Sequence, residues 1–330
     1  MREDTPINHP NVAAVLPQPQ GTSHNETTVS SQLECAQLMT IRNIKSQDKS
    51  GFSASVRFAS PVYFDCLPLL QTPSPCAENI NLIVFIPSAI QNSQRRDFIR
   101  NTWANVTTIN GVNIKVVFIL GTAPAIDSSK DQHKLQKEMY QHKDMVQFDF
   151  HDTYKNITYK HMLGIRWVNE FCPNTQYTLK TDDDVIVNIT HVINHLFFSK
   201  QKQNGFQCNV RKNSHVVREK IYTKIYIPWE EYAASTWPDF CQGFYYMVET
   251  QFLREIYDRS DAHAFLNLDD VFVTGLMANI LEIPRTQWPP IEQVYLLLNT
   301  EGEIPTLKSR VFVCMQHIDD MRFWKQVWEG

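Results

Sequence analysis

The stretch from Tyr177 to Asn188 reads YTLKTDDDVIVN. Its first five residues are typical of a buried strand, and Asp182, Asp183 and Asp184 follow directly. Three adjacent carboxylates repel one another and raise one another's pKa unless a positive charge meets them. A hard divalent cation such as Mg²⁺ or Mn²⁺ relieves that repulsion and keeps coordination positions that phosphate oxygens fill. The stretch therefore favours a metal and diphosphate site at the end of a strand over a solvated acidic loop.

Upstream of this stretch, strand-like and helix-like segments alternate. The continuous apolar runs are typical of strands buried on both faces. Between them, apolar residues recur at helical spacing, and Ser93 is predicted to cap the first helix. The expected strands are 82–86, 114–121, 146–150 and 177–181. The first expected helix starts at Ser93 and carries Phe98, Ile99 and Trp103 on its apolar face. Two further helices are expected at 128–142 and 159–171. This order predicts an α/β fold with a mostly parallel sheet flanked by helices, and a ligand beyond the carboxyl ends of the strands.

The two ends of the chain differ in character. Residues 1–78 are rich in Pro, Ser, Thr, Gln and Asn and are predicted to form a flexible stem or irregular region, with order increasing from Pro61 to Cys76. Residues 79–330 are predicted to form the catalytic domain. Its second half is less regular, with helices expected at 250–257 and around Met321, Trp324 and Trp328.

Composition excludes several classes of protein. The 330 residues are 43% hydrophobic and carry 31 basic and 35 acidic side chains, so that the formal charge is −4. A globular core is expected, and nucleic acid is not expected as a partner because there is no cluster of basic residues. The longest apolar runs have five residues, far below the roughly 18 of a membrane span, and the start MREDTPINHP does not resemble a signal peptide.

The seven cysteines lie far apart and form no C-x-x-C pair. Two or three disulfides with one leftover thiol are the favoured interpretation, and buried thiols in a reducing compartment are the alternative. N-x-T sequons at Asn25, Asn105, Asn156 and Asn188 weakly favour a secretory route.

Further residues have side chains that suit a metal and diphosphate site or its reaction, and each also has a structural interpretation. The basic cluster of Arg95, Arg96 and Arg100 follows the first strand and either clamps phosphate or ribose or pairs with nearby acids. Asp269 and Asp270 lie between apolar residues and offer either a general base or a charge at a helix start. His317 is either structural or a metal ligand, and the aromatic segment from Trp229 to Tyr246 is suited to sugar stacking or to packing.

Six blocks, in order, resemble the β-1,3-glycosyltransferases, which include β-1,3-galactosyltransferases and β-1,3-N-acetylglucosaminyltransferases. The resemblance covers the chain from Asn79 to about Trp328. The blocks are RRDFIRNTW at 95–103, VFILG at 117–121, DMVQFDFHDTYKNITYK at 144–160, KTDDDVIVN at 180–188, WPDFCQG at 237–243 and LDDVFVTG at 268–275. Two departures stand out: Asp269 replaces the usual Glu, and Thr274 is an extra residue before Gly275.

The resemblance implies a GT-A type, Rossmann-like fold and a hexosyltransferase that uses Mn²⁺ and a UDP-sugar. The enzyme would invert the anomeric carbon and form a β1,3 linkage to a glycan acceptor on a glycoprotein or glycolipid, with galactose as the favoured donor sugar. Asp270 would be the catalytic base, and Asp184, Asp182 and His317 the metal site. The resemblance further implies a donor site of Arg96, Arg100, Trp103, Lys180, Asp182 and Asp183, and an acceptor site of Trp229, Trp237, Asp239, Phe240 and Asp269.

Family members are membrane-anchored in the Golgi lumen, so the resemblance implies that location, although no anchor is visible in this sequence. Two alternatives remain open: a β-1,3-N-acetylglucosaminyltransferase, and a catalytically degenerate glycan-binding or scaffold protein of the same fold. The crowded segment around Gly243, Phe244 and Tyr245 motivates the second. A metal-dependent phosphohydrolase would account for the carboxylates alone.

Overall fold

The computed structural model describes residues 64–123, 128–200, 203–222, 224–260, 265–296, 307, 309–315 and 319–329, with the backbone alone at 128–130. The strands are β1 Leu69–Gln71, β2 Leu82–Pro87, β3 Thr108–Ile109, β4 Val112–Thr122, β5 Met145–His151, β6 Tyr177–Thr181, β7 Val185–Val187, β8 Phe206–Arg211, β9 Phe240–Glu249, β10 Arg285–Gln287, β11 Val294–Leu296 and β12 Phe312–Cys314. The helices are α3 Ser93–Asn101, α4 Ser128–His142, α5 Ile157–Phe171, α6 Ile189–Phe198, α7 Thr250–Asp258, α8 Ala278–Ile280 and α9 Met321–Glu329. Short 3₁₀ helices occupy Tyr154–Asn156 and Ile291–Gln293, and a π-helix occupies Val271–Met277.

The main sheet has a parallel centre. Its strand order is β1-β5-β4-β2-β6-β9-β8-β10, and β3 pairs with β4. Strands β5, β4, β2 and β6 run parallel, with Leu82 of β2 level with Ile114 of β4 and Tyr177 of β6. All six residues of β2 are buried, as the apolar run predicted. The carboxyl ends of these strands therefore lie at one edge of the sheet, which confirms the predicted α/β fold.

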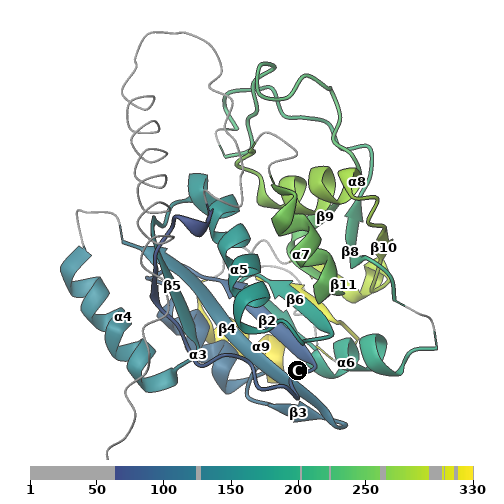
Figure 1. The fold of residues 1–330 in the computed structure, drawn as a ribbon. Coiled ribbons are helices and arrows are strands. Elements are labelled where there is room, and N and C mark those ends of the chain that lie inside the picture. The colour runs from purple at the N-terminus through teal and green to yellow at the C-terminus, as the bar shows by residue number, and fades with distance from the viewer. Residues whose placement is uncertain are drawn as a thin grey trace, which may run out of the picture.

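Helices cover both faces of this sheet (Figure 1). Helix α5 packs on β2 and β4, so closely that a Cβ at Gly164 would stand 2.9 Å from the Phe85 ring. Helices α3 and α9 pack on each other on the opposite face. A smaller sheet of order β11-β12-β7 adjoins the carboxyl end of β6.

Part of the expected stem belongs to the domain. Phe64 and Leu67 are buried in the core, and β1 pairs with β5. Cys76 forms a disulfide with Cys172 at the end of α5, and a second disulfide joins Cys208 to Cys241. Residues 1–63 lie outside the described part of the chain, so the stem predicted there stays a prediction.

The start of α3 differs from the prediction by one residue. Asn92, not Ser93, is the N-cap, because its carbonyl accepts the first intrahelical bond from the Arg96 amide. Trp103 lies just beyond the end of the helix and is buried. Across the described part of the chain, we find no helix with the length and apolar character needed to cross a membrane.

Candidate active site

The three aspartates form the turn between β6 and β7. The Asp182 amide donates to the Phe244 carbonyl of β9 at 3.1 Å, and the Asp184 carbonyl accepts from the Met315 amide at 2.7 Å. The turn is thus fixed by the main sheet on one side and by the end of β12 on the other. It places the three carboxylates at the sheet edge where the parallel strands end.

Asp183 is turned toward the protein. Its Oδ2 accepts hydrogen bonds from Ser88 Oγ at 2.7 Å and from Asn92 Nδ2 at 2.8 Å, and its Oδ1 accepts from Arg95 Nη1 at 3.3 Å. Ser88 follows β2 and Asn92 caps α3. Asp183 therefore joins the acidic turn to the neighbouring strand and helix.

Lys180 links the two acidic clusters of the site. Its ammonium group donates to Asp182 Oδ1 at 2.6 Å and to the Gly243 carbonyl, and it lies 3.9 Å from Asp269 Oδ2. Burial lowers the pKa of Lys180, but the charges of Asp182 and Asp269 outweigh burial and raise it above its usual value. Lys180 is therefore a fixed positive charge between the acidic turn and the second aspartate pair.

Asp269 is held as a carboxylate. His161 Nδ1 lies 2.9 Å from its Oδ2, and His161 Nε2 lies 2.7 Å from the Tyr246 hydroxyl. Burial lowers the pKa of His161, so the neutral ring donates from Nδ1 to the carboxylate and accepts at Nε2 from the phenol. Burial raises the pKa of Asp269, but the His161 hydrogen bond and the Lys180 charge hold it down to about 2.

Asp270 has the opposite character. Its Oδ1 accepts from the Val271 amide at 2.8 Å at the start of the π-helix. Burial and the adjacent charge of Asp269 raise the pKa of Asp270 to about 7. Two neighbouring carboxyl groups with separated pKa values are the arrangement by which enzymes keep one group ionised while the other exchanges a proton.

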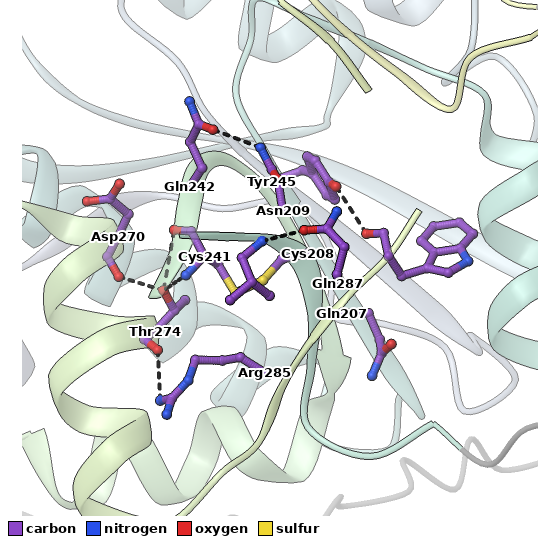
Figure 2. The surroundings of a disulfide bond; sticks show 12 residues. Gln207, Cys208, Asn209, Cys241, Gln242, Tyr245, Asp270, Thr274, Arg285 and Gln287 are labelled. Atoms are coloured by element: carbon purple, nitrogen blue, oxygen red, sulfur yellow. Dashed lines mark hydrogen bonds between the residues drawn. A yellow bond between two sulfur atoms is a disulfide. The ribbon is translucent and has the colours of Figure 1, made fainter. Parts of the chain in front are cut away.

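Thr274, the extra residue expected before Gly275, lies in the π-helix. One additional residue in a helix is accommodated as a π-helical turn, and Val271–Met277 forms such a turn. Thr274 Oγ1 donates to the Asp270 carbonyl at 2.6 Å and accepts from the Cys241 amide at 2.9 Å. Figure 2 shows Thr274 between Asp270 and the Cys208–Cys241 disulfide. Thr274 thus ties the backbone of Asp270 to β9.

The donor set at the acidic turn suits a hard cation. Burial, together with Asp182 and Asp183, raises the pKa of Asp184 to about 7, and burial raises that of Asp182. Arg95, 3.9 Å from Asp184, is its one ion-pair partner among the described residues. In that part of the chain no three His, Cys, Asp or Glu side chains are grouped to hold a metal. Mg²⁺-type sites need only one or two carboxylates plus phosphates and water, so Asp182 and Asp184 fit such an ion. His317, the third expected ligand, lies outside the described residues.

The arginines of the first block divide into two groups. Arg95 reaches the site through Asp183 and bonds Asp319 at 2.7 Å. Arg96 is completely buried and bonds Glu138 through two nitrogens, while Arg100 bonds Asp144 in the same way and shares Glu138. These pairs hold α3 to α4 and to Asp144, which directly precedes β5. The structure thus places Arg96 and Arg100, which the sequence assigned to the donor, in ion pairs within the protein, and it buries Trp103.

The expected acceptor residues differ in their exposure. Trp229 is 55% exposed, whereas Trp237 and Phe240 are buried in the core. Asp239 is half-buried directly before β9, and Asp269 lies within the His161 network. Trp237 packs on Tyr232 with ring centroids 4.4 Å apart. Packing was the alternative to sugar stacking that the sequence left open for this aromatic segment.

Sequence reasoning missed the partners that orient the carboxylates. His161 and Tyr246 orient Asp269, while Ser88 and Asn92 orient Asp183. One signal was available for His161, because a polar ring within the apolar stripe of α5 needs a buried partner.

Comparisons with known proteins show the family of the chain. Residues 94–289 match the family model described as Galactosyltransferase. A lactosylceramide 1,3-N-acetyl-beta-D-glucosaminyltransferase A of Xenopus laevis is 32% identical over 76% of this chain and 66% of its own length. The corresponding enzyme A of Danio rerio is 31% identical over 86% of this chain and 76% of its own length. Beta-1,3-galactosyltransferase 5 of Mus musculus is 32% identical over 60% of this chain and 63% of its own length.

Among solved structures, a bifunctional glycosyltransferase in its apo form aligns with a TM-score of 0.42 at 10% identity, over 76% of this chain and 48% of its own. The chain spans about two thirds of the length of the Xenopus relative. The family model covers more than half of the chain and includes the acidic turn and the Asp269–Asp270 pair. The chain therefore belongs to the Galactosyltransferase family.

Proposed function

We propose that the protein is a UDP-sugar-dependent β-1,3-glycosyltransferase that transfers galactose or N-acetylglucosamine to the 3-hydroxyl of a glycan. The observation that carries this proposal is that Lys180, bonded to Asp182 of the acidic turn, lies 3.9 Å from Asp269, the residue next to Asp270, whose pKa is raised to about 7. A proton acceptor then stands beside residues suited to a diphosphate. The named relatives transfer one or the other of these two sugars.

Asp270 is assigned as the general base. A base works best when its pKa lies near the operating pH, and the raised pKa of Asp270 meets that condition. Asp270 takes the proton of the acceptor 3-hydroxyl as that oxygen forms a bond to C1 of the donor sugar. The bond from C1 to the diphosphate breaks, and its electron pair leaves with UDP. A single displacement of this kind inverts C1.

The other residues keep Asp270 in place and in the correct charge state. Asp269 is ionised and hydrogen-bonded to His161. Its negative charge disfavours a second negative charge on the neighbouring Asp270 and so raises the pKa of Asp270. Lys180 prevents the two acidic clusters from repelling each other. A divalent cation held by Asp182 and Asp184, with His317 as an expected further ligand, would supply positive charge to the departing diphosphate.

We also propose that the enzyme works in the lumen of the Golgi apparatus on glycoprotein or glycolipid acceptors. Disulfides persist in oxidising compartments, and two disulfides lie in the described domain. The sequons at Asn105, Asn156 and Asn188 are consistent with passage through the secretory route.

A donor and acceptor screen tests this function. The purified chain is incubated with Mn²⁺ and UDP-galactose, UDP-N-acetylglucosamine or UDP-N-acetylgalactosamine, together with a panel of glycans ending in different sugars. We expect one of the first two donors to be used and the product to contain a β1,3 linkage. Binding of UDP without transfer from any donor would show a scaffold protein instead, and release of phosphate without transfer would show a phosphohydrolase.

A further inference from the structure

A cavity of about 450 Å³ lies between helix α6 and the strands β8 and β10. It is lined by eight residues, among them His195 of α6, Gln207 of β8 and Thr286 of β10. Strand β10 is at one end of the strand order of the main sheet, so the cavity lies at an edge of that sheet. Its volume is in the range of protein sites that bind small molecules.

The cavity lies on the face of the sheet opposite to the proposed base. Gln207 and Thr286 are paired across β8 and β10, so their side chains point to the same face. Arg285, the preceding residue of β10, points to the other face and donates to the carbonyls of Thr274 and Gly275 in the π-helix. Figure 2 shows Gln207 across the disulfide from Thr274. A ligand in the cavity is therefore separated from the proposed base by the sheet.

Carboxamide side chains supply most of the polar groups of the cavity. They belong to Gln203, Asn204, Gln207 and Gln287, and those of Gln203 and Gln207 are only 7% and 3% exposed. Gln207 Nε2 donates to the Asn204 carbonyl at 3.4 Å, which is longer than the usual range of such bonds. A carboxamide offers both donors and an acceptor, so these groups can pair with hydroxyl groups of a ligand.

The lining of the cavity is uncharged at neutral pH. The eight described residues that form it include no Asp, Glu, Lys or Arg, and burial lowers the pKa of His195 to about 4. The lining therefore lacks the cations that bind phosphate or carboxylate groups and the carboxylates that bind divalent cations. Its buried amides disfavour a wholly apolar ligand, which would leave them unpaired. The ligand that fits is uncharged and rich in hydroxyl groups.

Trp288 gives the cavity an aromatic wall that the backbone holds in place. Its amide donates to the Cys208 carbonyl at 3.0 Å, and its carbonyl accepts from the Tyr245 hydroxyl at 3.0 Å. The His195 ring stacks on the indole with the centroids 3.8 Å apart. A fixed aromatic ring beside convergent amides can pack against the CH groups of a sugar while the amides bond its hydroxyl groups.

We propose that this cavity is a second saccharide site, which binds an uncharged hexose or N-acetylhexosamine unit of a glycan apart from the site of transfer. Gln203 and Gln207 hydrogen-bond the hydroxyl groups of the sugar, and Trp288 packs against its ring. The inference goes beyond the proposed function, because binding here needs neither Asp270 nor a sugar donor. A glycan held at the cavity has its other branches at a raised effective concentration near the site of transfer.

The test uses the full chain and two cavity variants. Gln207→Leu removes the amide at nearly constant volume, and Thr286→Trp fills the cavity from an exposed position of β10. A matched control, Gln71→Trp, places the same large side chain at an exposed position of β1, the strand at the opposite end of the sheet. Binding of lactose, N-acetyllactosamine and N,N′-diacetylchitobiose is measured by saturation-transfer NMR and calorimetry without UDP or Mn²⁺. Thermal unfolding checks that each variant is folded.

We expect wild type to bind at least one of these disaccharides, Gln207→Leu to bind it about tenfold more weakly, and Thr286→Trp to lose binding at the cavity. The control binds as wild type. In transfer assays, KM for the smallest acceptor that wild type uses stays within about twofold in both cavity variants, while KM for a branched glycan that can occupy both sites rises.

Wild type that binds none of the disaccharides overturns the inference, as do cavity variants that bind them as wild type does. An equal rise in KM for both acceptors places the cavity within the site of transfer and also overturns it. Binding of a glycoprotein without binding of its released glycan shows a peptide ligand instead. Absence of transfer from every donor overturns the proposed function, while the NMR measurement still reports on the cavity separately.

Discussion

Gly243 lies against Asp270 so closely that a Cβ at residue 243 would stand 3.3 Å from the Asp270 Oδ2 atom. The carbonyl of the same glycine accepts a hydrogen bond from Lys180. The missing side chain therefore lets β9 approach the proposed base and the lysine together. The side chains that follow Gly243 pack into the core: Phe244 and Tyr245 are buried, and the Tyr245 and Phe312 rings stack with their centroids 3.7 Å apart.

Replacing Gly243 with alanine is expected to reduce turnover with little effect on folding. The added methyl group must displace the Asp270 carboxylate by a few tenths of an ångström, and misplacement of a reacting group by about 1 Å costs on the order of 10²-fold. We therefore expect kcat to fall about tenfold while KM for the UDP-sugar changes little. Steady-state kinetics checks this, and unchanged kcat would show that Asp270 does not act from its present position.

The Thr274 hydroxyl is expected to position the base. Thr274→Val keeps the shape of the side chain but leaves the Asp270 carbonyl and the buried Cys241 amide without this partner, at a cost of about 1–3 kcal/mol in unfolding free energy. Thr274→Ser retains both hydrogen bonds. We expect kcat to fall in the valine variant and to recover in the serine variant, with KM for the donor unchanged in both. Equal losses in the two variants would argue for packing of the methyl group instead.

Arg96 is expected to act on stability, in contrast to its assignment to the donor from sequence. Arg96→Met leaves Glu138 with Arg100 alone and the Ser88 hydroxyl without its guanidinium contact. Breaking a buried ion pair costs about 3–5 kcal/mol, which chemical denaturation measures. Arg322→Met, at a side chain that is 90% exposed and pairs with Asp320, serves as the comparison and should unfold at nearly the wild-type denaturant concentration. A stable Arg96 variant with weakened UDP binding would restore the donor assignment.

The activity is expected to depend on pH through Asp270. The base must be deprotonated, and its pKa is raised to about 7, so kcat/KM should rise with pH, with the midpoint of the rise near pH 7. Asp269→Asn removes the neighbouring negative charge, which lowers the pKa of Asp270 and moves the rise to lower pH. If the pH profile of Asp269→Asn is the same as that of wild type, the group whose titration controls the activity is not Asp270.

The unfolding free energy also depends on pH through Asp270, but it falls over the range in which the activity rises. Because the folded-state pKa of Asp270 lies above the ordinary value of 3.8, the folded protein binds more protons than the unfolded chain between these values. The contribution of Asp270 to the unfolding free energy therefore falls as pH rises from about 4 to 7. Asp270→Asn removes this titrating group, and its unfolding free energy should decline less over that range.

Sequence patterns predicted the central sheet because buried parallel strands are continuous apolar runs. Strands β2, β4, β5 and β6 lie within two residues of the expected positions. The three-residue strands β7, β10, β11 and β12 are too short to show a period, and their pairing comes from tertiary contacts. The π-helix escaped prediction because its residues, Val271–Met277, are mostly apolar and all buried, so they show no period that separates a π-helix from an α-helix.

The site was predictable only where a charge stands out from its neighbours. Asp182 to Asp184 follow a buried strand, and Asp269 and Asp270 lie among apolar residues, so the sequence marked them. His161 and Asp269 are 108 residues apart, and Arg96 and Glu138 are 42 apart. Whether an arginine binds a ligand or pairs with an acidic residue on another helix depends on such distant partners. The spacing of residues within one segment does not predict which partners those are.

The central claim is that Asp270 is the base of a glycosyl transfer, and transfer by the Asp270→Asn variant tests it most directly. Asparagine keeps the size of the side chain but cannot accept the proton. The account predicts that transfer to the acceptor identified for wild type falls about 10²–10⁴-fold, while calorimetry shows UDP binding in the presence of Mn²⁺ at the wild-type affinity. Transfer by Asp270→Asn at the wild-type rate would contradict the account.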